Sequence, residues 1–174
     1  MRPCFDNDII NRSCYFENAF STLTIDIPQG SMKDGCPVIQ YTLNNRFNQR
    51  FNIYRAGMYY KIGNLNSKLF ISMDKKGLPG TPIVQKKNCD EKWQMWTIEY
   101  QGKNLFLIRS AQDPSLFMGI KDNSIKPEDG LVTTITEEYA LWKIIGFIPR
   151  WDSCWLVDGI LWEGWSERKK LKRL

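Results

Sequence analysis

The chain of 174 residues contains no histidine. Histidine is the commonest proton shuttle near neutral pH and a usual zinc ligand, so its absence weighs against acid–base catalysis and against histidine-containing zinc sites. The sequence also has no Gly-x-Ser-x-Gly element, no Walker loop and no dinucleotide-binding fingerprint. Carboxylates that could hydrolyse a glycoside are present, but no pattern pairs two of them. We therefore expect a protein that is not an enzyme and that has no cofactor and no metal.

Long apolar runs are also missing. No run approaches the roughly 20 residues that a membrane-spanning helix needs, and the segment after Met1 lacks the apolar stretch of a signal peptide. The five cysteines are widely spaced and include no Cys-x-x-Cys pair, which is typical of proteins in a reducing compartment. These absences predict a cytoplasmic protein, or a secreted one if Met1 is not the native start.

The composition is that of a folded domain. Hydrophobic residues make up 43% of the chain and charged residues 25%, and the net charge is a modest +5. The length fits one domain with short extensions. We expect a lead over residues 1–13, a domain over residues 14–149 and a C-terminal extension over residues 150–174.

A short phrase that ends in an aromatic residue recurs along the chain. The phrases Gln-Arg-Phe, Gln-Met-Trp and Ala-Leu-Trp end at Phe51, Trp96 and Trp142, which lie 45 and 46 residues apart. Between them, short apolar runs are divided by Gly, Pro, Asn and Asp, as strands and turns are. Repetition at this period predicts three copies around an axis that share one core. We expect about twelve strands, a closed barrel and the three aromatic residues inside it.

The repeats resemble those of the ricin-type β-trefoil lectins, whose copies close with a Gln-x-Trp phrase. Residues 25–35 are similar to the family's L-D-V-x-G-G-S-x-x-D-G stretch, and residues 37–51 to its P-V-Q-L-Y-x-C-N-G-x-x-N-Q-x-W stretch, both without a gap. The resemblance covers about Tyr15 to Pro149. It implies an all-β fold, namely a β-trefoil of three pseudo-symmetric repeats.

In that family each repeat can hold one shallow sugar site. An aromatic ring stacks on the C–H face of a pyranose, while a carboxylate and an Asn-Gln pair bind its hydroxyls. The resemblance therefore implies a glycan partner of galactose type or similar. The matching residues of the first copy are Asp26, Tyr41, Asn48 and Gln49, with Asn44 as a further polar neighbour.

The other copies depart from this pattern. In the second copy Ser72 stands in place of the acidic residue and Lys86 in place of the aromatic one. In the third copy Gly119 stands in place of the acidic residue, and the Asn-Gln pair is missing. The first copy departs once, because Ile39 takes the slot that often holds a contacting glutamine and Gln40 follows it. We expect at most one site.

The C-terminal extension is rich in tryptophan and in basic residues. It holds four of the seven tryptophans within fifteen residues, and five of its last seven residues are basic. If the extension is helical, the tryptophans lie on one side of the helix. The extension either packs back on the barrel or docks onto a protein assembly or an anionic surface. The candidate docking residues are Trp151, Trp155, Trp162, Trp165, Arg168, Lys169 and Lys170.

Two functions remain open from the sequence. The first is a non-catalytic carbohydrate-binding protein that uses the first-copy site. The second is a degenerate trefoil that serves as a structural or adaptor subunit of an intracellular assembly through its tryptophan-rich basic extension. The two altered copies, the extension itself and the loss of the family's intra-repeat disulfides favour it; in the first copy Thr24 and Leu43 stand in the disulfide slots. In that case Asp26 could cap a turn, Asn48 and Gln49 could fix a hairpin, and Tyr41 could be a surface residue. The complete acidic, aromatic and amide set of the first copy favours carbohydrate binding.

Overall fold

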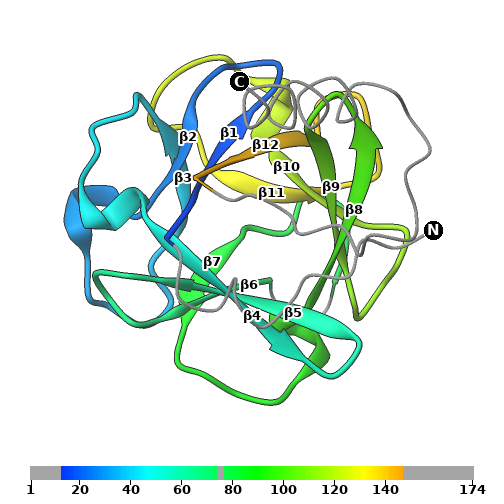
Figure 1. The fold of residues 1–174 in the computed structure, drawn as a ribbon, viewed down its shortest axis with the longest axis horizontal. Helices are drawn as coiled ribbons and strands as arrows, with labels where there is room; N and C mark the ends of the chain where they lie inside the picture. The colour runs from blue at the N-terminus through cyan, green and yellow to red at the C-terminus, as the bar shows by residue number, and fades with distance from the viewer. Residues whose placement is uncertain (1–12, 74–76, 147–174) are drawn as a thin grey trace, which may run out of the picture.

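The computed structural model describes residues 13–73 and 77–146, and in these ranges the chain is built from short strands (Figure 1). The helical segments of the described part are single 3-10 turns, and none is long and apolar enough to cross a membrane. The 3-10 turns are η2 (Pro28–Gly30), η3 (Phe47–Gln49), η4 (Lys92–Gln94) and η5 (Lys121–Asn123). The strands are β1 (Tyr15–Asn18), β2 (Thr24–Asp26), β3 (Ile39–Tyr41), β4 (Phe51–Ala56), β5 (Tyr59–Asn64), β6 (Phe70–Ser72), β7 (Val84–Lys86), β8 (Trp96–Gly102), β9 (Leu105–Ser110), β10 (Phe117–Ile120), β11 (Leu131–Thr134) and β12 (Leu141–Ile145).

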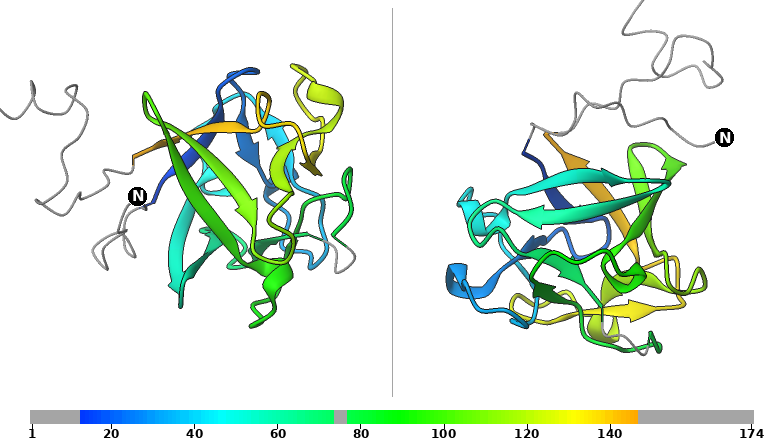
Figure 2. Two further views of the ribbon diagram at one scale, coloured as in Figure 1. Left: turned by 90° about the vertical axis from the view of Figure 1, so that its right-hand side faces the viewer. Right: turned by 90° about the horizontal axis from the view of Figure 1, so that it is seen from below.

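Six of these strands close a barrel. Antiparallel pairing runs from β1 to β12, β9, β8, β5 and β4 in turn. A bridge between Cys14 and Phe51 joins the two ends of this path, so the barrel has no open edge. The remaining strands form three hairpins, β2–β3, β6–β7 and β10–β11. Figure 2 shows the barrel strands from the side and from below.

The three hairpins meet in a ring of backbone hydrogen bonds. The N–H of Val38 donates to Ile83 O at 3.0 Å, the N–H of Ile83 to Leu131 O at 2.8 Å, and the N–H of Leu131 to Val38 O at 2.9 Å. These residues precede β3, β7 and β11 or begin them, one from each repeat. The ring shows the expected threefold pseudo-symmetry. The prediction of an all-β trefoil with about twelve strands is confirmed.

The aromatic residues that close the repeats lie in the shared core. Phe51, Trp96 and Trp142 are at most 1% exposed. The indole N–H of Trp96 donates to Ile71 O at 3.1 Å, and that of Trp142 donates to Met118 O at 2.8 Å. Trp96 is the first residue of β8, and Trp142 is the second residue of β12. Each bond links this barrel strand to the first strand of the hairpin in the same repeat. The prediction for these three residues is confirmed.

Buried polar side chains tie each hairpin to a neighbouring repeat. Gln40 is fully buried; it accepts a hydrogen bond from the Ser21 hydroxyl at 2.7 Å and donates to Ser124 O and Lys126 O, both at 2.9 Å. The second repeat has the same arrangement around Gln85, whose partners are Ser67, Ser31 and Lys33. Gln40 is therefore a structural link between the first and third repeats.

Two expected segments lie outside the described residues. They are the lead, apart from Ser13, and the C-terminal extension with its candidate docking residues Trp151, Trp155, Trp162, Trp165, Arg168, Lys169 and Lys170. The domain limits of 14 and 149 therefore stay a prediction.

Candidate functional site

The candidate residues of the first repeat converge at the end of the β2–β3 hairpin. Asp26 ends β2, Tyr41 ends β3, and Asn48 and Gln49 end the 3-10 turn η3. Asp26 pairs with Ile39 across the hairpin. Because side chains alternate along a strand, Asp26, Ile39 and Tyr41 share one face of the hairpin, while Gln40 lies on the other.

The carboxylate of Asp26 is held by two amide side chains. Asn48 Nδ2 lies 3.0 Å from both carboxylate oxygens, and Gln49 Nε2 donates to Oδ2 at 2.7 Å. The same two nitrogens also donate to backbone carbonyls, Asn48 to Ile27 O at 3.1 Å and Gln49 to Thr42 O at 2.9 Å. The two amide groups are therefore fixed in orientation, and they hold the carboxylate in one orientation.

Burial sets the electrostatics of this residue. Asp26 is 3% exposed, and the loss of hydration raises the pKa of its carboxyl above the ordinary value of 3.8. The hydrogen bonds from Gln49 and Asn48 favour the charged form and offset part of that rise. The fold thus holds a carboxylate in place that burial alone would disfavour.

Gln49 and Asn44 differ in exposure. Gln49 is fully buried, and its Oε1 accepts the backbone N–H of Asn44 at 2.7 Å. Asn44 in turn accepts the N–H of Arg46 through Oδ1 at 2.8 Å, which fixes the loop before η3. Gln49 therefore holds Asp26 and the loop from the protein interior, whereas Asn44 lies exposed at the surface.

A hollow of about 930 Å³ lies over this group. Two of its aromatic side chains are open to solvent, Tyr41 at 37% exposure and Phe47 at 68%. The hollow is lined by Asp26, Pro28, Gln29, Gly30, Ile39, Tyr41, Asn44, Arg46, Phe47, Asn48, Asn66 and Glu128. Four of the five candidates named from the sequence, Gln49 being the exception, therefore line one surface depression.

Sequence reasoning missed several residues of this lining. Phe47 had no distinctive local signal, because its exposure is known only from the structure and single exposed apolar residues are common. Asn66 and Glu128 had none, since they belong to the second and third repeats and reach the hollow only through the closure of the trefoil. Asn66 donates to Gly30 O at 2.9 Å, which joins the second repeat to the rim of this site.

The second repeat has a neutral version of the same arrangement. Gln94 Nε2 donates to Ser72 Oγ at 2.9 Å and to Lys87 O at 3.0 Å, and its Oε1 accepts the N–H of Cys89 at 2.8 Å. The register places Lys86 at the position of Tyr41. The scaffold glutamine is thus kept, while the carboxylate and the aromatic ring are replaced.

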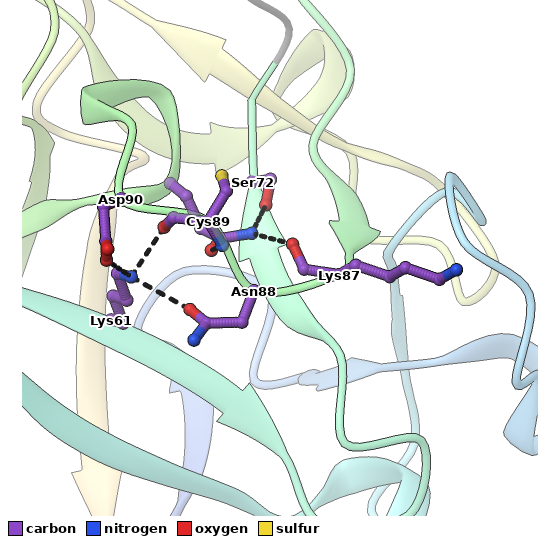
Figure 3. Close-up of polar contacts among 7 residues, drawn as sticks. Lys61, Ser72, Lys87, Asn88, Cys89 and Asp90 are labelled. Carbon is purple, nitrogen blue, oxygen red and sulfur yellow. Dashed lines mark hydrogen bonds and ion pairs between the residues drawn. The ribbon is translucent and has the colours of Figure 1, made fainter.

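A lysine anchors the loop of this second repeat (Figure 3). Lys61 Nζ donates to Asn88 Oδ1 at 2.9 Å, to Cys89 O at 2.6 Å and to Asp90 Oδ1 at 2.9 Å. Lys61 is 6% exposed, so its ammonium group interacts with these protein acceptors rather than with solvent. The loop after β7 is thus held by this lysine as well as by the Gln94 amide, whereas the Gln49 amide holds the loop after β3.

In the third repeat, the Thr134 side chain occupies the space that a side chain at Gly119 would take. A Cβ atom at Gly119 would lie 2.5 Å from Thr134 Cγ2. Ala140 stands at the position of Gln49, and the ring of Tyr139 packs on Phe20 with centroids 4.8 Å apart. Across the described residues, the acidic, aromatic and amide set is complete in the first repeat alone. The same part of the chain has no group of three Cys, Asp or Glu side chains that could hold a metal ion.

The sequence matches a family profile described as "Ricin-type beta-trefoil lectin domain-like". The matches cover residues 9–86 and 47–136, which together span well over half of the chain. The chain belongs to this family. A comparison with curated proteins gives no match.

Solved structures of the same fold are similar to this one at low sequence identity. The designed threefold-symmetric protein ThreeFoil has a TM-score of 0.74 at 16% identity, over 78% of this chain and 99% of that chain. The exo-β-1,3-galactanase 1,3Gal43A from Clostridium thermocellum gives 0.74 at 18% identity, over 79% of this chain but 30% of that one. The ricin B-like lectin of Macrolepiota procera in complex with lactose gives 0.65 at 16% identity, over 76% and 93%. These likenesses show the fold.

Proposed function

We propose that this protein is a non-catalytic carbohydrate-binding protein that binds a glycan at one shallow site in its first repeat. The observation that carries the proposal is the Asp26 carboxylate, held by Asn48 and Gln49 at the base of a hollow beside the exposed ring of Tyr41. Family membership supports carbohydrate binding, and the lactose complex of the Macrolepiota procera lectin supports a glycan of galactose type.

The geometry suits a pyranose ring. A carboxylate has about four lone-pair positions, so three amide contacts leave acceptor capacity for sugar hydroxyls. The carboxylate is already fixed, and little ordering is needed when the ligand arrives. Tyr41 and Phe47 offer aromatic surface for the C–H face of the ring. Asn44, whose Oδ1 is occupied by the Arg46 N–H, offers its NH2 group as a donor at the rim.

A glycan array probed with the wild type and with Asp26→Ala and Tyr41→Ala tests this proposal. The wild type should bind at least one galactosylated glycan, and both variants should lose that binding. Lys86→Ala is the matched control, because Lys86 holds the position of Tyr41 in the second repeat and should not contribute. Absence of binding to every glycan at millimolar concentration would falsify the proposal.

An adaptor role through the C-terminal extension stays a prediction from the sequence, as does a cytoplasmic location. Its candidate residues lie outside the described part of the chain, and its support is the composition of residues 150–174. Capture of partners by the full chain and by a chain that ends at residue 149 tests it. An unchanged set of partners would contradict it.

A further inference from the structure

One turn recurs in all three repeats with a left-handed backbone. Gly35, Gly80 and Glu128 occupy equivalent positions, with φ of 81°, 80° and 74°. Each donates its N–H to a carbonyl in the middle of the hairpin strand of another repeat, at 2.7, 2.7 and 2.8 Å. The acceptor of Glu128 is Gln40 O, next to Tyr41. Two copies therefore use glycine at this turn, and the third uses a charged residue.

Glutamate at this position is conformationally strained. Glycine adopts a positive φ without steric cost, whereas a residue with a Cβ atom is disfavoured there. A Cβ atom placed on Gly35 or Gly80 would meet nothing within 4 Å. Backbone conformation, rather than lack of space, thus explains glycine in the other two copies. Eight other non-glycine residues of the described chain also have a positive φ, so the position of the Glu128 side chain, rather than its backbone alone, marks it out.

The Glu128 side chain lines the hollow of the first repeat, although it comes from the third. Within residues 13–73 and 77–146, no hydrogen bond or ion pair engages its carboxylate. Glu128 is exposed, so its side chain fills no gap in the core. The strain at this turn is thus not offset by a stabilising contact of the side chain within the described structure.

We propose that Glu128 is a specificity-determining residue of the first-repeat site, which selects neutral glycans over anionic ones. Its carboxylate accepts a hydrogen bond from a sugar hydroxyl and repels a carboxylate or sulfate at the same place. Asp26 and Glu128 bring two negative groups to the hollow against the single guanidinium of Arg46. This inference rests on the proposed function and adds the class of glycan that the site takes.

An array that carries neutral galactosylated glycans beside their sialylated and sulfated forms tests the inference. The wild type should favour the neutral member of each pair. Glu128→Gln and Glu128→Gly should both lower the ratio of neutral to anionic binding roughly two- to fivefold, as expected for one partly exposed charge. Added salt should bring the wild-type ratio of neutral to anionic binding closer to one, and it should leave the ratio of Glu128→Gln nearly unchanged. Glu138→Gln, which removes an exposed charge at the third repeat, is the control and should keep the wild-type ratio.

Thermal unfolding of the same variants separates binding from folding. The proposal predicts that Glu128→Gly unfolds at the same temperature as the wild type or at a higher one, because glycine relieves the strained turn. A purely structural role predicts a lower midpoint and an unchanged binding ratio, and that result would overturn the inference alone. A wild type that binds no glycan on the array would overturn it together with the proposed function.

Discussion

Asp26 shows most clearly how a single residue separates folding from function. A buried carboxylate is costly unless it is hydrogen-bonded, and Asn48 and Gln49 meet that requirement. The second repeat solves the same structural problem with the neutral hydroxyl of Ser72, which accepts a hydrogen bond from Gln94. Where the scaffold glutamine is present, it needs an acceptor at this position but no charge. Under the proposed function, the charge of Asp26 serves the ligand rather than stability.

Substitutions at Asp26 should separate these two roles. Asp26→Ala removes the carboxylate acceptor of the Asn48 and Gln49 amides and leaves them only their backbone acceptors, so we expect a loss of about 1–3 kcal/mol in the free energy of unfolding. Asp26→Ser copies the second repeat and should lose less. Both variants should lose glycan binding. Denaturant unfolding measures the stability of each variant, and titration with glycan measures its binding. If Asp26→Ser bound glycan like the wild type, the assigned role of the carboxylate would be wrong.

The raised pKa of Asp26 predicts opposite pH dependences for stability and binding. Because burial raises the pKa above 3.8, the native state takes up this proton more readily than the unfolded state. The contribution of Asp26 to stability is therefore fully present below pH 3.8 and is lost as the pH rises through the raised pKa. Glycan binding needs the carboxylate and should strengthen over the same interval.

Comparison with Asp26→Asn isolates this effect. The free energy of unfolding of the wild type minus that of Asp26→Asn should fall as the pH rises from about 3 to 7. Asparagine does not titrate, so the difference removes the contribution of all other groups. A difference that grows with pH would contradict the assigned direction of the pKa shift.

At the scale of elements, the two faces of the β2–β3 hairpin contact different parts of the molecule. Strand alternation puts Gln40 on the opposite face from Tyr41, where it links two repeats. The sequence predicted the hairpins from their Gly, Pro, Asn and Asp boundaries, and it predicted Asp26 and Tyr41 from the matched motif. It did not predict that Gln40 and Gln49 are fully buried, because burial depends on the neighbouring repeat and on η3 rather than on local pattern.

Loss of the Gln40 link should weaken the whole domain. Gln40→Ala removes its bonds to Ser21, Ser124 and Lys126, so we expect a cost of about 1–3 kcal/mol in the free energy of unfolding. Gln101→Ala, at an exposed position near the end of β8, should stay within about 0.5 kcal/mol of the wild type. Equal midpoints for the two variants in a urea titration would count against this assignment.

At the scale of the molecule, the three repeats form one structure rather than three. The ring through Val38, Ile83 and Leu131 and the shared core of Phe51, Trp96 and Trp142 join them at the centre. The period of the closing aromatic residues was enough to predict this arrangement, because each copy leaves an apolar face that its neighbours must cover. Asn66 and Glu128 could not be assigned to the site in advance, since the closure of the trefoil brings them there from other copies.

This joint core predicts cooperative unfolding. The main core of the described structure draws residues from all three repeats, so tryptophan fluorescence and far-ultraviolet circular dichroism should report the same midpoint in urea. Because four of the seven tryptophans lie in residues 150–174, a chain that ends at residue 149 is measured beside the full chain. Separate transitions for the two signals in both chains would show that the repeats are more independent than the ring of hydrogen bonds implies.

The central claim is that one glycan binds to each chain at the first repeat. A calorimetric titration of the full chain with a galactosylated glycan chosen from the array tests it directly. We expect a stoichiometry of one, loss of the heat signal in Tyr41→Ala and an unchanged signal in Lys86→Ala. A stoichiometry of three, or binding that survives Tyr41→Ala, would contradict the account.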